Sequence, residues 1–174
     1  MNLDWKRTEG GLTGLAKGLL LAGGILLGIV AARIWIQPYT VSDNSMLPNL
    51  REGDSVYCIK HTTPKVGDIV LFESPVEPDK VLLKRVIAGE GDTVEIKDSV
   101  VLINGRNAAF SWKIIDRDSR IFPMSFSYRD NYPIIKLKRR QLFLLGDNID
   151  HSMDSRFFGP INIESVIGRL LYKM

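Results

Sequence analysis

Val81-Leu-Leu-Lys-Arg-Val-Ile87 has the composition of a β-strand with two cations near its centre. Side chains alternate between the two faces of a strand, so Lys84 and Arg85 project from opposite faces, each among aliphatic neighbours. We therefore expect one of the two cations to be partly desolvated. Desolvation lowers the pKa of a lysine and gives a neutral amine that can accept a proton, which arginine cannot do. Taken alone, the pattern favours a plainer interpretation, a lysine at a sheet edge that reaches water.

The residues around this stretch predict a mainly β domain. Asn104-Gly105 predicts a type I′ hairpin turn, because both residues tolerate the positive φ which that turn requires. Residues 108–133 break the rhythm of strands and turns, and we expect an irregular excursion or a small subdomain there. Short runs rich in Val, Ile, Leu and aromatic residues predict strands at 55–60, 68–72, 81–88, 93–97, 100–103, 134–137, 141–145 and 166–172.

The N-terminal 36 residues differ from the rest of the chain. The run from Gly18 to Ile36 contains one charge, Arg33, and approaches the ~20 residues that a bilayer core requires. Basic residues ahead of the run place the N-terminus in the cytoplasm. We therefore expect a cytoplasmic segment at 1–17, a transmembrane anchor at 18–36 and an extracytoplasmic domain at 38–174. A cleavable signal peptide is the alternative, and the absence of a small-x-small site before Pro38 counts against it. The basic residues are Lys6, Arg7 and Lys17.

Composition excludes several classes of function. The 174 residues carry 23 Lys and Arg against 20 Asp and Glu, a balance too even to indicate a nucleic-acid partner. The single cysteine, Cys58, lies in an apolar run and is expected to be a buried thiol. One cysteine and two distant histidines do not make a zinc site. The acidic stretch 147–154 lacks the glycine and glutamate of an EF-hand loop, so we predict no metal and no cofactor.

Four segments give Lys84 a chemical context. They are Val41–Leu50, which contains Ser-Met-Leu-Pro, Gly67–Phe72, Leu83–Glu95 and Gly146–Pro160. In this order, behind an N-terminal anchor, they resemble the conserved boxes of type I signal peptidases. Those boxes read Ser-Met-x-Pro-Thr-Leu, Lys-Arg-Val-x-Gly-x-x-Gly-Asp and Gly-Asp-Asn…Ser-x-Asp-Ser-Arg…Gly. The resemblance covers residues 38–172 and the anchor.

The resemblance implies a fold, an activity and a set of site residues. The implied fold is an antiparallel β-sheet catalytic domain of signal-peptidase type with one N-terminal transmembrane helix. The implied enzyme is a serine endopeptidase of the bacterial inner membrane that removes signal peptides from exported preproteins without a cofactor. Its implied residues are the nucleophile Ser45, the general base Lys84, the lysine-orienting Ser152, the structural pair Asp154 and Arg156, the cleft residue Met46, and the turn formed by Gly146, Asp147 and Asn148.

The sequence departs from the family pattern at Asp43, Asn49 and Ala88, where the family has Ser or Gly, Thr, and Gly. Asp43 concerns catalysis, because a carboxylate in the oxyanion hole would face a developing negative charge. We expect Asp43 to turn away and cap the adjacent turn. The Ser45 N–H and an unidentified second donor would then bind the oxyanion.

Other functions are compatible with parts of the sequence. A Ser-His-Asp triad would use His61 or His151, although neither has a supporting motif. A peptidase dedicated to one or a few exported substrates, or a catalytically weak relative acting as a binding module, would retain the same boxes. The basic run 136–140 would bind lipid or a polyanion, although a solvated edge strand explains it more simply.

Overall fold

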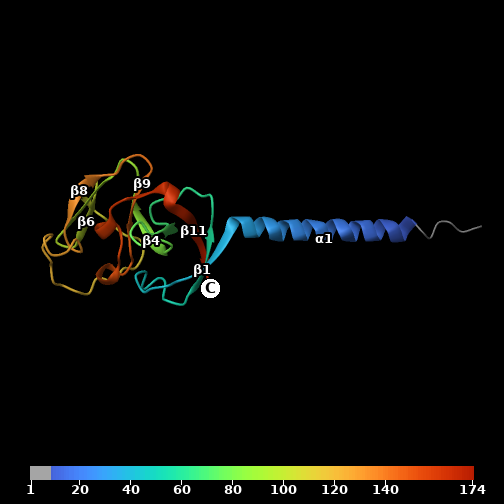
Figure 1. Ribbon diagram of the computed structural model, residues 1–174, viewed down its shortest axis with the longest axis horizontal. Coiled ribbons are helices and arrows are strands. Elements are labelled where there is room, and N and C mark those ends of the chain that lie inside the picture. Colours follow the sequence, from blue (N-terminus) through green and yellow to red (C-terminus); the bar gives the residue numbers. More distant parts are fainter. Residues whose placement is uncertain (1–8) are drawn as a thin grey trace, which may run out of the picture. The chain divides into compact units, whose positions relative to one another are not determined.

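The protein falls into two compact units, Met1–Ile36 and Gln37–Met174. The structure, a computed structural model, describes the backbone of residues 9–174 and, within that range, all side chains except those of 9–12, 31 and 32 (Figure 1). The predicted basic residues Lys6 and Arg7 lie outside the described residues.

The first unit contains one long helix, α1, from Glu9 to Trp35. Its segment Thr13–Trp35 has a mean hydropathy of 2.1, and its length and composition suffice to cross a membrane. The described side chains of the helix are exposed, including large aliphatic ones on all sides. A helix that is apolar all round suits a lipid environment. The helix begins before residue 18 and ends one residue before the predicted anchor does, because Ile36 begins the first strand.

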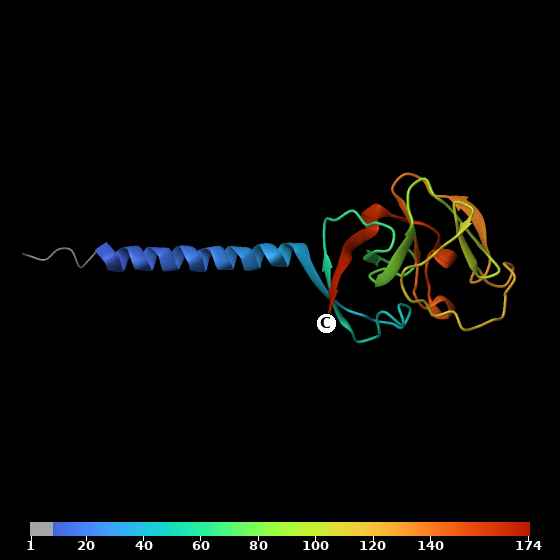
Figure 2. The same ribbon diagram turned by 180° about the vertical axis from the view of Figure 1, so that it is seen from behind.

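The second unit is built from two antiparallel sheets, which confirms the predicted mainly β fold. The larger sheet has the order β1-β2-β11-β3-β4-β9-β10 and the smaller one the order β7-β6-β5-β8. Within this unit the smaller sheet lies at the end away from β1 in both views (Figures 1 and 2). The strands are β1 (Ile36–Thr40), β2 (Ser55–Ile59), β3 (Ile69–Glu73), β4 (Val81–Ala88), β5 (Thr93–Lys97), β6 (Val100–Ile103), β7 (Arg106–Asn107), β8 (Tyr132–Lys136), β9 (Gln141–Leu145), β10 (Ile161–Asn162) and β11 (Val166–Lys173).

Strand β4 is buried on both faces and connects the cores of the domain. It pairs with β3 on one side and β9 on the other, and residues 82–88 are all buried. Leu83 packs with the core beneath the loop after β1, Leu82 packs with Phe72 of β3, and Ile87 packs with the core between the two sheets. A strand held on both edges and both faces is a rigid support for any side chain that it carries.

The irregular parts of the domain are held by turns, short helices and ion pairs. Asn104 and Gly105 have φ values of 53° and 73°, which confirms the predicted type I′ turn between β6 and β7. Residues 108–131 contain no strand and touch the rest of the domain through a bridge between Ile115 and Asn148. Arg129 forms ion pairs with Asp118 and Asp130 within the excursion and with Asp150 outside it, at 3.5 Å. The short helices are η2 (Ile149–His151), α2 (Ser155–Phe158) and η3 (Ile163–Ser165).

Candidate active site

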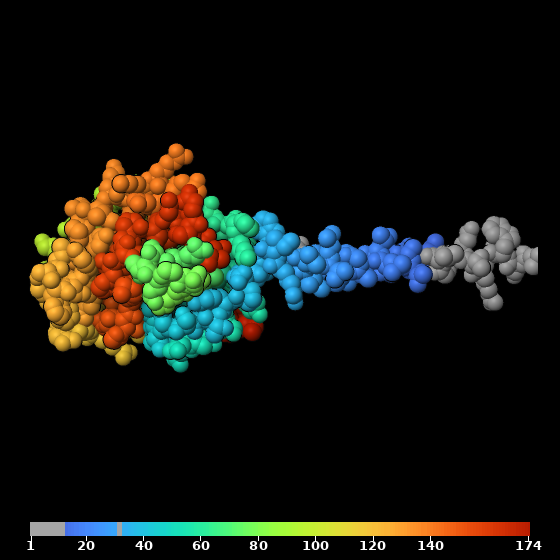
Figure 3. All heavy atoms as spheres, in the orientation of Figure 1, coloured from blue at the N-terminus to red at the C-terminus, as the bar shows by residue number. Residues whose placement is uncertain are grey.

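The loop after β1 presents Ser45 toward the centre of β4. Met46 beside it is fully buried in the same core cluster as Leu83, which fixes the depth of the loop. The Asn148 N–H donates to the Ser45 carbonyl at 2.9 Å, and the Asn148 side chain donates to the carbonyl of Asn44 at 3.1 Å. Ser45 is therefore held from both sides, although its segment has no regular structure. In Figure 3 the green segment near residue 80 lies beside the cyan loop and the red C-terminal segments on one face of the domain.

Lys84 projects from β4 onto Ser45. Its side chain is 1% exposed, and Nζ lies 2.6 Å from Ser45 Oγ and 3.1 Å from the carbonyl oxygen of Leu83. Burial penalises the ammonium form and lowers the pKa of Lys84, although the Asp43 and Asp154 carboxylates oppose that effect. A buried amine with a lowered pKa, in contact with a serine hydroxyl, is the arrangement that a lysine general base requires.

Asp43 faces Ser45, so the expectation that it turns away is wrong, although it does cap the adjacent turn as expected. Its Oδ1 accepts the Ser45 backbone N–H at 2.9 Å and the Ser45 hydroxyl at 2.6 Å. Burial alone would raise the pKa of Asp43, but the nearby Lys84 cation and these two hydrogen bonds hold that pKa below its ordinary value. The carboxylate of Asp43 is stabilised here by the Lys84 cation and by two hydrogen-bond donors of Ser45. The expectation had considered only the negative charge that develops on the substrate oxygen during the reaction.

Asp154 and Arg156 form a buried ion pair behind the dyad. Asp154 is inaccessible to solvent and accepts two bonds from the Arg156 guanidinium, each at 2.9 Å. It also accepts the Gly146 N–H at 3.0 Å and caps the N-terminus of α2 through the Arg156 N–H. Burial alone would raise the pKa of Asp154, but Arg156 and the Gly146 N–H hold that pKa below its ordinary value. The pair therefore joins the end of β9 to α2.

Gly146 allows three segments of the site to meet. A Cβ atom at this position would lie 2.2 Å from Ser152 Oγ and 2.6 Å from the Ser45 carbonyl oxygen, so only glycine fits. Ser152 is buried against it, and the hydrogen bonds of the Lys84 amine go to Ser45 Oγ and the Leu83 carbonyl oxygen rather than to Ser152. The structure thus places Ser152 next to the Ser45 loop, whereas the predicted bond from Ser152 to the lysine amine is not formed.

Arg85 is a site residue that the sequence reasoning left without a role. It lies on the opposite face of β4 from Lys84 and forms a bidentate pair with Asp147, at 2.8 and 2.7 Å. Its guanidinium also lies over the ring of Trp112, 4.6 Å from the centroid. Asn49 donates to Asp147 at 2.8 Å, so the residue that replaces the family's threonine joins the same network. The alternation of Lys84 and Arg85 along the strand already indicated that Arg85 points into the opposite face of the sheet. Its partner Asp147 lies 62 positions further along the chain, so the pairing could not be inferred from the sequence.

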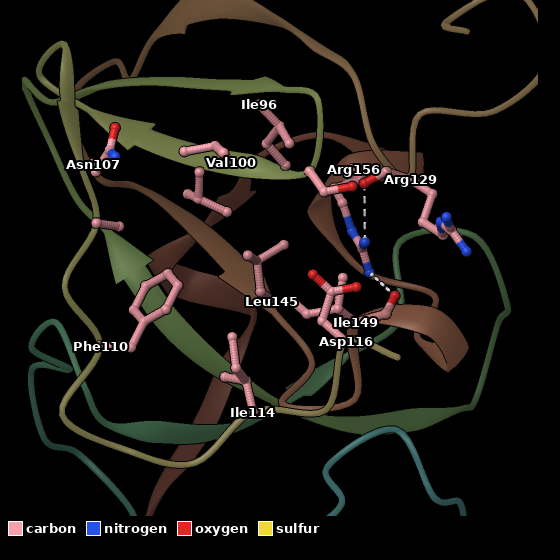
Figure 4. A pocket seen from close by; sticks show the side chains of 13 residues that line it. Ile96, Val100, Asn107, Phe110, Ile114, Asp116, Arg129, Leu145, Ile149 and Arg156 are labelled. Atoms are coloured by element: carbon pink, nitrogen blue, oxygen red, sulfur yellow. Dashed lines mark hydrogen bonds between the residues drawn. The ribbon is translucent and has the colours of Figure 1, made fainter. Parts of the chain in front are cut away.

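A separate cavity of about 220 Å³ lies between the smaller sheet and the excursion (Figure 4). Neither Ser45 nor Lys84 lines it. Arg156 crosses its wall, where the guanidinium donates to the carbonyl oxygens of Ile149 at 2.9 Å and Arg129 at 3.2 Å. The cavity is thus on the far side of the Asp154–Arg156 pair from the dyad, and we assign it no part in the chemistry.

The histidine alternative finds no geometric support at Ser45. The hydrogen-bond partners of the Ser45 hydroxyl are Asp43 and Lys84, and both His61 and His151 are exposed. The prediction for the thiol is confirmed: Cys58 is fully buried, and burial raises its pKa to about 11.

A serine hydroxyl in contact with a buried lysine amine, on a rigid antiparallel sheet, is the arrangement expected of a serine hydrolase that uses lysine as its base. Comparison with known families agrees with this class. Residues 13–174 match the family described as signal peptidase, peptidase S26. The chain belongs to the signal peptidase family.

Individual relatives are similar over most of the chain. Signal peptidase I V of Bacillus subtilis is 34% identical over 158 residues, which cover 82% of this chain and 92% of that protein. Thylakoidal processing peptidase 1 of Arabidopsis thaliana is 30% identical over 151 residues, which cover 79% of this chain but only 41% of the relative. A crystal structure of a signal peptidase I from Enterococcus faecalis V583 is 28% identical, covers 63% of this chain and 98% of its own, and gives a TM-score of 0.49.

Proposed function

We propose that this protein is a membrane-bound serine endopeptidase that removes signal peptides from exported preproteins. The observation that carries the proposal is the 2.6 Å contact between Ser45 Oγ and the buried Lys84 amine. Family membership supplies the substrate class, and it favours general signal-peptide removal over maturation of one dedicated substrate.

In the proposed mechanism Lys84 acts first as base and then as acid. Neutral Lys84 takes the hydroxyl proton while Ser45 Oγ attacks the scissile carbonyl carbon, and a tetrahedral oxyanion forms. The resulting ammonium returns the proton to the amine of the mature protein as the peptide bond breaks. A water molecule then attacks the acyl-enzyme and loses a proton to Lys84. Lys84 passes that proton to Ser45 Oγ as the ester bond breaks, which releases the signal peptide with a new carboxyl group and restores the dyad.

The remaining predicted residues support these two groups. Ser152, beside the Ser45 loop, is proposed to bind the lysine amine once substrate rearranges the site. The Asp154–Arg156 pair fixes the segment that carries Ser152, and the Asp147–Arg85 pair fixes the other face of β4. Met46, expected to line the substrate cleft, is instead fully buried in the core and packs beneath the loop that carries the nucleophile.

We also propose that α1 anchors the enzyme in a bacterial cell membrane, with the N-terminus in the cytoplasm and residues 38–174 on the opposite side. The apolar segment Thr13–Trp35 has the necessary length. The basic residues ahead of it support this orientation. The bilayer is thus a proposed partner, and the arrangement places the catalytic domain on the side where preproteins emerge.

The test is cleavage of a standard preprotein by the full chain in detergent. Ser45→Ala is expected to abolish cleavage while folding is retained. Ser42→Ala is the matched control, because this exposed serine of the same loop contacts Tyr39 rather than Lys84. Cleavage by Ser45→Ala at a rate near that of the wild type would remove Ser45 from the mechanism. Accumulation of many precursors in a depletion strain, rather than of one, would separate general from dedicated processing.

A further inference from the structure

Asp43 occupies both groups of Ser45 that the reaction needs. The Ser45 backbone N–H is the expected oxyanion donor, yet it donates to Asp43 Oδ1. The hydroxyl has a single proton, and it too is directed to Asp43 Oδ1, while Lys84 donates to the hydroxyl oxygen. In this arrangement the nucleophile's proton points away from its base. The structure therefore shows a resting state of the site.

Asp43 also acts on Lys84 through charge. Both groups contact the same hydroxyl oxygen, each at 2.6 Å, so they lie within about 5 Å of each other. An anion at this distance favours the protonated form of an amine. The groups that face these two from other elements are Lys80, just before β4, and the paired Asp154 and Arg156. Because Asp154 is neutralised by its own arginine, Asp43 is the anion directed at the dyad.

We propose that Asp43 is a positioning residue that holds Ser45 and Lys84 in a resting arrangement and sets the pH range in which the dyad works. This inference rests on the proposed function, because it concerns the same site. The scissile carbonyl oxygen has to displace the carboxylate from the Ser45 N–H. The Ser45 hydroxyl then turns its proton toward Lys84. A glycine at this position would impose neither requirement.

The main experiment compares the pH dependence of kcat/KM in Asp43→Ala and Asp43→Asn with that of the wild type. Without the anion the pKa of Lys84 falls further, so the neutral amine persists at lower pH. The rise of kcat/KM with pH should therefore begin about one unit lower in both variants. That shift corresponds to roughly tenfold higher kcat/KM on the acid side. Asp43→Ala should also raise the plateau, because it frees the N–H.

Glu52→Gln is the matched control. It removes one negative charge from the same loop, but the Glu52 carboxylate contacts Asn44 rather than Ser45. Its pH profile should coincide with that of the wild type. Profiles of both Asp43 variants that coincide with the wild type would overturn the inference. So would a hundredfold loss of kcat in both with folding intact, since the carboxylate would then assist the reaction.

A second measurement needs no substrate and so separates this inference from the proposed function. The Lys84 amine can be titrated by ¹⁵N NMR in the selectively labelled full chain in detergent micelles. Asp43→Asn is expected to lower the midpoint of that titration by about one pH unit. An unchanged midpoint overturns the inference even if the enzyme cleaves preproteins. A lowered midpoint supports it even if the preprotein chosen is not cleaved.

Discussion

Replacing Asp154 by asparagine should test how strongly the buried pair supports the site. The change preserves the size of the side chain but removes its charge. Arg156, which is 1% exposed, would keep its carbonyl partners but have no carboxylate in contact. Removing one partner of a buried ion pair typically costs about 3–5 kcal/mol, because the other charge is left uncompensated. For a domain of this size, that cost corresponds to a fall in Tm of roughly 10–20 °C.

The assay is thermal unfolding of the full chain in detergent, followed by circular dichroism. Asp118→Asn is the matched control, since it also removes a carboxylate bound by arginine. There the pair is more exposed, and Arg129 retains Asp130 as a partner, so the change in Tm should be small. If Asp154→Asn lowers Tm no more than Asp118→Asn does, the reasoning from burial is refuted.

Three further predictions concern single positions. Lys84→Arg should be as inactive as Lys84→Ala in preprotein cleavage, because a guanidinium stays protonated and cannot act as a base. Wild-type activity should rise with pH through an apparent pKa below the ~10.4 of free lysine. Substantial activity in the arginine variant would show that the residue supplies only charge. His61→Ala and His151→Ala should each retain most activity, and a loss of more than about a hundredfold in either would revive the triad. Gly146→Ala should lower both Tm and activity, since its Cβ would lie 2.2 Å from a side-chain oxygen, whereas Gly89→Ala, with its nearest neighbour at 3.9 Å, should be tolerated.

The sequence predicted the strands that have a strong local pattern. β4 and β5 occur at the predicted bounds, because aliphatic runs between turn residues determine both their existence and their ends. β7 and β10, of two residues each, were missed, since their pairing comes from tertiary contacts rather than from any run of residues. β1 was assigned in part to the anchor, because Ile36 continues the apolar run of the helix.

The site was predicted in its residues but not in all of its contacts. Motif spacing identified Ser45 and Lys84, which the structure brings together. The pairing of Asp154 with Arg156 was also anticipated, but the role of Asp154 as the N-terminal cap of α2 was not. The contact between Arg85 and Asp147 and the direction of Asp43 were not anticipated. Both depend on charges that meet only after the chain has folded.

The adjacency of Lys84 and Arg85 on β4 has a consequence for insertions and deletions. A displacement of the strand by one residue would leave hydropathy, net charge and strand propensity unchanged. It would nevertheless turn each cation to the other face. In one direction Arg85 would take the place of Lys84 beside Ser45 and Val86 that of Arg85, and in the other Lys84 would take the place of Arg85 beside Asp147 and Leu83 that of Lys84. In the first case the guanidinium beside Ser45 could not give up a proton and Asp147 would lose its partner; in the second the dyad would lose its base, and an ammonium could not form two parallel hydrogen bonds to Asp147. The proposed dyad therefore depends on the exact register of β4, and a single-residue insertion or deletion in the loop before β4 should be tolerated only if the loop absorbs it completely.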